Sequence, residues 1–217
     1  MIIGINGKIG AGKDTVGKII QGLLLMNKNQ SSEIKKFAGK LKQIASILTG
    51  IPVEQFEDQE FKKTLLGPEW GTVKHNPLNA IPVFEDVQFN HLMSVRELLQ
   101  KLGTEAMREG LHTNVWVNAL FADYKLWSDG RKDWYPNWII TDMRFPNEME
   151  AVVEKGGLTI RVVRPSFMVD GKVIAKDLHP SETALDDAKF DYEIINEGTM
   201  EELVKKVRAI LVKEELI

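Results

Sequence analysis

The sequence contains no cysteine among its 217 residues, and this absence excludes disulfide bonds, thiol catalysis and cysteine-based zinc sites. Neither charge sign dominates, because 28 basic residues stand against 31 acidic ones for a net charge of −3. Nothing therefore indicates a general nucleic-acid-binding surface, and we expect basic residues to act locally. The four histidines also lack the spacing of metal ligands: His75, His91, His112 and His179.

Long hydrophobic runs are missing as well. The longest run, Leu23–Met26, is far too short to span a membrane. The chain begins directly on an apolar strand pattern without a basic and apolar leader, which predicts a cytoplasmic protein with no membrane partner. A hydrophobic share of 43% suffices for a buried core, and the length suits a single α/β domain over residues 1–217 with an insertion.

A glycine-rich segment follows the first apolar residues. Residues 1–5 read MIIGI and residues 7–15 read GKIGAGKDT, which predicts a strand, a tight loop and the start of a helix. Backbone N–H groups can converge on phosphate oxygens only where no side chain blocks them, which explains the glycines. Lys13 adds a mobile positive charge for the β- and γ-phosphates of a nucleoside triphosphate. We expect these residues to bind it: Gly10, Ala11, Gly12, Lys13, Asp14 and Thr15.

One position departs from the usual phosphate-binding pattern. Asp14 occupies the place of a magnesium-binding hydroxyl, and Thr15 follows it. Asp14 could hold Mg²⁺ directly or through water, or it could simply favour the positive end of the helix, and both interpretations stay open. Thr15 is expected to contact the α-phosphate.

Strands and helices alternate along the rest of the chain. Apolar patterns predict strands at 2–6, 33–38, 138–141, 158–163 and 192–196, and helices at 13–27, 39–48, 116–127, 148–155 and 200–215. Ser94 and Glu97 match a helix capping box, and Gly103 is expected to end or interrupt that helix. Such alternation predicts a parallel sheet sandwiched by helices, and with the glycine-rich loop after its first strand this sheet is expected to be of the P-loop NTPase type. Two segments interrupt it: an irregular insertion over 51–93, with a small strand at 83–87, and a polar excursion over 165–190.

Polar residues follow the predicted strands at the edge where parallel sheets bind ligands. Asp142 ends one buried strand and would organise magnesium or substrate. Arg144 could bind a phosphate bidentately, or it could pair with Asp142 or Glu148. Arg164 closes the next strand, so we expect one active-site edge that carries Lys13, Asp142, Arg144 and Arg164.

Several blocks in order carry a resemblance to a known family. Residues 12–15 (GKDT), 37–42 (FAGKLK), 96–105 (RELLQKLGTE) and 142–148 (DMRFPNE) resemble the deoxynucleoside monophosphate kinases of tailed bacteriophages, as do 179–182 (HPSE) and 195–203 (INEGTMEEL). The resemblance spans nearly the whole chain and is poorest over 51–93. It implies a P-loop kinase fold, ATP and Mg²⁺ as cofactors and a deoxynucleoside monophosphate as substrate in nucleotide supply to DNA synthesis. Relatives of this kind suggest a homodimer.

The resemblance also assigns roles to individual residues. Lys42 and Arg96 would meet the acceptor phosphate; alternatively Lys42 is solvated and Arg96 pairs with a neighbouring glutamate. A cation in the first turn of a helix opposes the dipole, which is easier to understand if a phosphate lies near Arg96. The expected catalytic residues are Lys13, Arg96, Asp142 and Arg144, and the expected substrate-binding residues are Lys42, Arg96, Gly103, Thr104, Trp116, Asp142, Arg144 and Glu148.

Two further expectations concern the base and a lid. Trp116 could stack on the nucleobase or belong to the core. Segment 165–190 would close over ATP as a lid, with Arg164 on adenine or phosphate. His179 and Glu182 would latch this lid or contact the substrate.

Two other functions stay open. One is a P-loop kinase for another small phosphorylated acceptor, such as dephospho-coenzyme A or phosphomevalonate, and the other is a non-catalytic ATP-binding switch module. The block DMRFPNE at 142–148 favours the deoxynucleoside monophosphate kinase over the first alternative. A switch module would instead be expected to show paired acids after the strand, where this chain has one carboxylate followed by Arg144.

Overall fold

The computed structural model describes residues 1–73, 89–130, 132–165, 168–169, 172–173 and 182–217. Within it the chain forms two compact units. The sheet unit comprises Met1–Gly39 and Trp116–Ile217, and the helical unit comprises Lys40–Val115. The insertion that the sequence predicts over 51–93 falls inside the helical unit.

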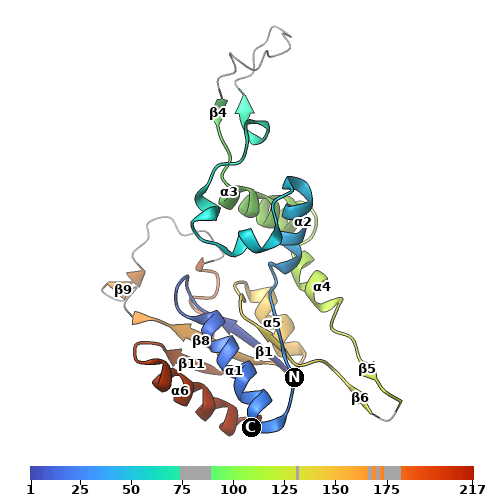
Figure 1. Ribbon diagram of the computed structural model, residues 1–217, viewed down its shortest axis with the longest axis vertical. Coiled ribbons are helices and arrows are strands. Elements are labelled where there is room, and N and C mark those ends of the chain that lie inside the picture. The colour runs from blue at the N-terminus through green and yellow to red at the C-terminus, as the bar shows by residue number, and fades with distance from the viewer. Residues whose placement is uncertain (74–88, 131, 166–167, 170–171, 174–181) are drawn as a thin grey trace. The chain divides into compact units, whose positions relative to one another are not determined.

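A five-stranded parallel sheet forms the centre of the sheet unit (Figure 1). Its strands are, in spatial order, β11 (Tyr192–Ile195), β8 (Leu158–Val163), β1 (Ile2–Asn6), β7 (Trp138–Ile140) and β2 (Glu33–Lys35). All neighbouring strands pair in parallel, as the alternation of strands and helices predicts. The first strand lies in the middle, so the chain turns to opposite sides of β1 as it builds the sheet. Loops at the carboxyl ends of the strands therefore converge around the end of β1.

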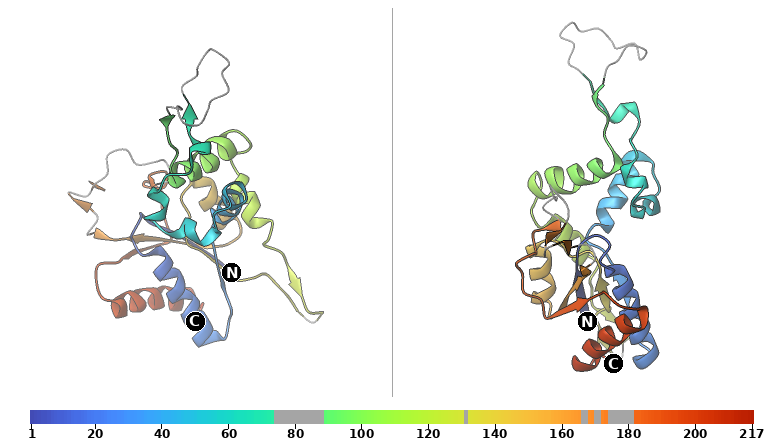
Figure 2. Two further views of the ribbon diagram at one scale, coloured as in Figure 1. Left: turned by 45° about the horizontal axis from the view of Figure 1, so that its top comes forward. Right: turned by 90° about the vertical axis from the view of Figure 1, so that its left-hand side faces the viewer.

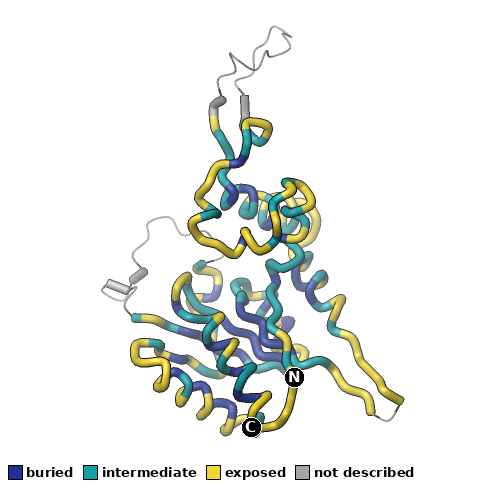
Figure 3. Tube along the Cα trace, viewed as in Figure 1, coloured by how far each residue is buried: buried dark blue, intermediate teal, exposed yellow. Residues whose placement is uncertain are grey.

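Helices cover both faces of this sheet. Helix α1 (Lys13–Lys28) and helix α6 (Met200–Lys213) lie together on one face, and α5 (Pro146–Glu154) lies on the opposite face (Figure 2). Successive side chains of a strand point to opposite faces, so Ile3 and Ile5 pack into the cluster with α1 and α6, whereas Ile2 packs with α5. The central strands are buried on both sides (Figure 3), which explains their continuous apolar sequence.

The helical unit has its own smaller core. Its helices are α2 (Gly39–Thr49), whose first residue belongs to the sheet unit, α3 (Val95–Gln100) and a π-helix at Lys101–Glu109, with short 3₁₀ turns at Val53–Glu57, Phe61–Lys63 and Pro68–Trp70. Strands β3 (Thr72–Val73) and β4 (Phe89–His91) pair antiparallel. The core of the unit consists of Ala45, Phe56, Leu66, Val95 and Leu98.

The predicted capping box of the helix after residue 93 is confirmed for Ser94, whereas the Glu97 side chain contacts other side chains. The Ser94 hydroxyl accepts a hydrogen bond from the Glu97 N–H at 3.2 Å. The Glu97 side chain contacts His91 at 2.5 Å. The helix does not end at Gly103, because it continues as the π-helix, although its regular α-geometry is interrupted at Lys101.

Two predicted elements are shorter in the structure. The strand expected over 33–38 ends at Lys35. The helix expected over 116–127 is α4 (Val115–Phe121), and Trp127 instead belongs to a hairpin of β5 (Trp127–Ser128) and β6 (Asp133–Trp134). The helix ends early because Tyr124 turns to pack on Trp138, with ring centroids 4.8 Å apart.

Some expectations fall wholly or partly outside the described residues. The small strand at 83–87 and His179 lie outside them, as does much of the segment 165–190. Within that segment β9 (Met168–Val169) pairs antiparallel with β10 (Lys172–Val173). Of the helices in the described ranges, none is long and apolar enough to cross a membrane.

Candidate functional site

The loop between β1 and α1 has the backbone geometry of a phosphate cradle. Gly10 and Gly12 adopt φ angles of 77° and 99°, in the left-handed region that favours glycine. A Cβ on Gly12 would also lie 2.6 Å from the side-chain nitrogen of Asn196. The Ala11 N–H donates to the Lys8 carbonyl at 3.1 Å and closes the turn. The glycine that precedes Lys13 is therefore required both by conformation and by space.

Asn196 holds this loop from the end of β11. Its Nδ2 donates to the Ala11 carbonyl at 2.9 Å, and its own N–H donates to the Val163 carbonyl at 2.7 Å. Asn196 belongs to the block of resemblance at 195–203 but is not among the expected site residues. An asparagine at the end of the predicted strand 192–196, at the ligand-binding edge, was the available signal.

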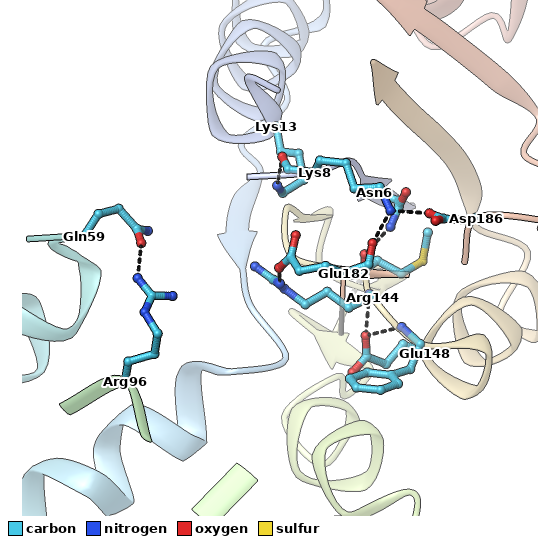
Figure 4. A network of polar contacts seen from close by, with 11 residues as sticks. Asn6, Lys8, Lys13, Gln59, Arg96, Arg144, Glu148, Glu182 and Asp186 are labelled. Carbon is cyan, nitrogen blue, oxygen red and sulfur yellow. Dashed lines mark hydrogen bonds and ion pairs between the residues drawn. The ribbon is translucent and has the colours of Figure 1, made fainter. Parts of the chain in front are cut away.

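Lys13 is the central cation of the site. Its Nζ donates to the Lys8 carbonyl at 2.9 Å (Figure 4). Burial, together with the positive charge of Arg144, lowers the pKa of Lys13 from 10.5 to about 8. Three carboxylates act in the opposite direction on the pKa: Glu182, Asp14 and Asp142. An incoming polyanion would compensate the buried ammonium more completely than these groups do.

Asp14 lies in the first turn of α1, and its contacts involve one carboxylate oxygen. Thr141 Oγ1 donates to Asp14 Oδ1 at 2.7 Å, and Lys36 Nζ lies 3.6 Å from the same oxygen. Among the residues that the structure describes, Oδ2 has no hydrogen-bond or ion-pair partner, and the side chain is 62% exposed. Thr141 and Lys36 are not among the expected site residues. In the structure they directly follow β7 and β2, whereas the strands expected at 138–141 and 33–38 include them.

Asp142 is held by backbone amides. Its Oδ1 accepts the Phe37 N–H at 2.7 Å and its Oδ2 accepts the Ala38 N–H at 3.0 Å. These two N–H groups precede α2, and their use by Asp142 explains why the strand expected over 33–38 stops at Lys35. The contacts thus tie the end of β7 to the chain that follows β2.

Arg144 is engaged by Glu182, which lies in the predicted lid segment 165–190. Its Nη1 forms an ion pair with Glu182 Oε1 (Figure 4). Glu148 is buried and accepts hydrogen bonds from the backbone N–H groups of Arg144 and Phe145, at 2.7 and 3.1 Å. Glu148 therefore fixes the start of α5 and, through the backbone, the position from which Arg144 extends.

Lys8, in the glycine-rich loop, also contacts the predicted lid segment. Its Nζ donates to the Glu182 carbonyl and pairs with the carboxylate of Asp186 (Figure 4). Sequence reasoning named Glu182 but not Lys8 or Asp186. The three cations Lys8, Lys13 and Arg144 are thus gathered at one end of the sheet, as expected of a site for phosphates.

The helical unit carries the residues expected on the acceptor side. Lys42 is buried rather than solvated, and its Nζ lies 2.6 Å from Glu57 Oε1. Arg96 donates from Nη2 to Gln59 Oε1 at 3.2 Å (Figure 4), and it has no carboxylate partner among the described residues. The adjacent Glu97 instead pairs with other side chains.

The remaining expected residues differ in exposure. Gly103 is buried, and a Cβ there would lie 2.9 Å from Leu41 Cδ2, while Thr104 is half-buried. Trp116 is only 4% exposed, which favours the core over a stacking surface. Arg164 is exposed just after β8.

Comparison with known proteins adds a family to this geometry. A family model described as deoxynucleotide monophosphate kinase matches residues 53–207. The deoxynucleoside-5'-monophosphate kinase of Escherichia phage T5 is 25% identical over 90% of this chain and 89% of its own length. The deoxynucleotide monophosphate kinase of Enterobacteria phage T4 is 30% identical over 63% of this chain and 60% of its own. Among solved structures, shikimate kinase from Aquifex aeolicus covers 100% of this chain and 99% of its own, with 14% identity and a TM-score of 0.41.

Proposed function

Since the chain belongs to the deoxynucleotide monophosphate kinase family, we propose that it transfers the γ-phosphoryl group of ATP to deoxynucleoside monophosphates, with Mg²⁺. The products are the deoxynucleoside diphosphate and ADP. The observation that carries the assignment of the donor site is the glycine-rich loop with Lys13 and Arg144 beside it. The expected enzyme is cytoplasmic, acts on a small molecule rather than a nucleic acid, and forms a homodimer.

The reaction needs positioning and charge neutralisation. An oxygen of the acceptor phosphate forms a bond to the γ-phosphorus, and the bond from that phosphorus to the β,γ-bridging oxygen breaks. The electron pair stays on the β-phosphate of ADP. The acceptor phosphate is anionic at neutral pH, so no general base has to remove a proton from it.

The residues of the loop bind the donor phosphates in this proposal. The backbone amides of Gly10 to Thr15 would surround the α- and β-phosphates at the positive end of α1. Lys13 would leave the Lys8 carbonyl for the β- and γ-phosphates. Arg144 would stabilise charge on the transferred group, with Arg164 nearby on adenine or phosphate.

In this proposal Asp14 is the protein ligand of Mg²⁺. Its side chain is 62% exposed, its Oδ2 is oriented by the contacts of Oδ1, and Mg²⁺ prefers hard oxygen donors of this kind. In the described part of the chain no three acidic, histidine or cysteine side chains form a metal-binding group. A single carboxylate fits an ion held mainly by phosphate oxygens and water, and when bound this ion would neutralise the β- and γ-phosphates.

The acceptor is assigned to cations of the helical unit. Arg96 is suited to a phosphate because a glutamine amide, not a carboxylate, is its contact. Lys42 would contact the acceptor phosphate while it is also paired with the carboxylate of Glu57. Gly103 and Thr104 remain proposed neighbours of the base or sugar. The burial of Trp116 supports a role in core packing rather than stacking on the base.

A coupled ADP-release assay tests the proposal. The four deoxynucleoside monophosphates and their ribose counterparts are offered with ATP and Mg²⁺, and dephospho-coenzyme A and an acceptor-free reaction serve as comparison arms. We expect turnover with at least one deoxynucleoside monophosphate, and its loss in Lys13→Met, which keeps the length of the side chain without its charge. Turnover with dephospho-coenzyme A alone, or with none of these acceptors, would overturn the assignment.

A further inference from the structure

The hydroxyl that is absent from the phosphate-binding loop is present on the neighbouring strand. P-loop NTPases of the usual pattern hold Mg²⁺ with a Ser or Thr hydroxyl of the loop and an Asp at the end of a nearby strand. In this chain the loop position holds Asp14, and Thr141 directly follows β7. Their side chains are joined by a hydrogen bond of 2.7 Å. The same two chemical groups therefore meet here, but the carboxylate comes from the loop position and the hydroxyl comes from the end of the strand.

Asp142, the residue after Thr141, has a carboxylate at the end of the strand, but this carboxylate is engaged with the backbone. Both oxygens of Asp142 accept backbone N–H groups, from Phe37 and Ala38. These bonds direct the carboxylate to the start of α2. Thr141 is thus the strand-end side chain that contacts the position of the usual magnesium ligand.

The burial and the hydrogen bond of Thr141 allow it to orient the carboxylate of Asp14. Its side chain is buried, with 1% exposure, and its hydroxyl proton is donated to Asp14 Oδ1. The donation holds Oδ1, and on this 62% exposed side chain Oδ2 makes no hydrogen bond or ion pair with the described residues. The carboxylate is consequently fixed at one oxygen and available at the other.

We propose that Asp14 and Thr141 form an exchanged metal-binding pair, in which the loop carboxylate ligates Mg²⁺ and the strand hydroxyl is its positioning residue. The inference rests on the proposed function, because it takes Mg²⁺ with bound ATP as the ligand. It gives the aspartate at the loop position a role, because the loop then supplies the carboxylate and Thr141 supplies the hydroxyl that contacts it.

Lys36 has the opposite effect on the site. Its Nζ lies 3.6 Å from the same Asp14 oxygen, so its positive charge opposes the binding of a cation. Removing the hydroxyl of Thr141 and removing the charge of Lys36 should therefore change metal affinity in opposite directions. A general loss of structure would lower the affinity in both variants.

The first experiment measures Mn²⁺ binding by electron paramagnetic resonance, with the full chain and ATP present and the acceptor omitted. Thr141→Val keeps the shape of the side chain without its hydroxyl, and we expect it to weaken Mn²⁺ binding about threefold to tenfold, the range of one typical intramolecular hydrogen bond. Thr141→Ser should retain the wild-type affinity, and Lys36→Met should tighten Mn²⁺. Unchanged affinity in Thr141→Val, or weakened affinity in Lys36→Met, would overturn the inference.

The second experiment restores the usual arrangement. Asp14→Thr leaves two hydroxyls and no carboxylate in the pair, so it should bind Mn²⁺ less well than the wild type. The double variant Asp14→Thr/Thr141→Asp, which places the carboxylate on the strand, should bind Mn²⁺ more tightly than Asp14→Thr alone, whereas no recovery in a folded double variant would contradict the exchange. Circular dichroism checks folding, and Thr141→Val keeps the inference testable if the buried aspartate unfolds the chain. Because Mn²⁺ binding needs no acceptor, a failed kinase assay would refute the proposed function without deciding this result.

Discussion

The pH dependence of ATP binding follows from the burial of Lys13. The pKa of this lysine is lowered to about 8, so the free protein loses the charge of Lys13 as the pH rises from 7 to 9. By the same value, about nine-tenths of Lys13 is charged at pH 7 and about one-tenth at pH 9. The phosphates of ATP should restore the pKa of the bound lysine to its ordinary range or above. Binding at pH 9 must then include uptake of a proton.

The expected magnitude is a Kd for ATP about tenfold higher at pH 9 than at pH 7. Isothermal titration calorimetry with acceptor omitted measures it, and two buffers of different ionisation enthalpy report the proton taken up. The terminal phosphate of ATP has lost its proton by about pH 7, so it contributes little to the change. Lys13→Arg is the matched control, since its guanidinium stays charged and its Kd should not vary over this range.

The stability of the free protein should change in the opposite direction. Between pH 8 and 10.5 the unfolded chain binds more protons at Lys13 than the folded chain does, so the free energy of unfolding rises with pH. The full shift corresponds to about 3 kcal/mol. A wild-type Kd that stays constant from pH 7 to pH 9, without proton uptake, would refute the combination of a lowered Lys13 pKa and a contact of Lys13 with phosphate.

Three further predictions use neighbouring contacts. Glu182→Gln removes a charge that raises the pKa of Lys13 and should lower the pH midpoint of ATP binding, whereas Arg144→Gln should raise it, and shifts in the same direction would contradict the assigned electrostatics. Gly12→Ala should abolish detectable ATP binding in calorimetry, because its Cβ would enter the space of Asn196 at a φ of 99°; wild-type affinity would show that the loop can relax. Asp142→Asn places an amide against one of two backbone N–H groups and should lower the free energy of unfolding in urea by about 1–3 kcal/mol, while an unchanged value would exclude this anchoring role.

Much of the sheet unit could be predicted from local sequence pattern. The strand at 2–6 and the loop and helix that follow it are confirmed, since apolar periodicity and glycine placement act over a few residues. The parallel sheet is confirmed for the same reason, because alternating strands and helices leave few topologies. The helix after residue 115 was predicted too long, because its end depends on the packing of Tyr124 on Trp138, which local pattern does not encode.

In the candidate site, too, local sequence predicts some features and tertiary contacts determine the others. The sequence by itself determined that Lys13, Asp142 and Arg144 belong to one edge of a parallel sheet, since residue type and position after a strand suffice for that conclusion. Only the tertiary structure decided their partners: Asp142 faces two amides more than a hundred residues away, and Arg144 faces Glu182. Asp14 meets Thr141 across 127 residues of chain. The residues of each pair are far apart in the sequence, and no regular spacing relates them. Their contacts therefore form only when the tertiary structure brings the strand ends together.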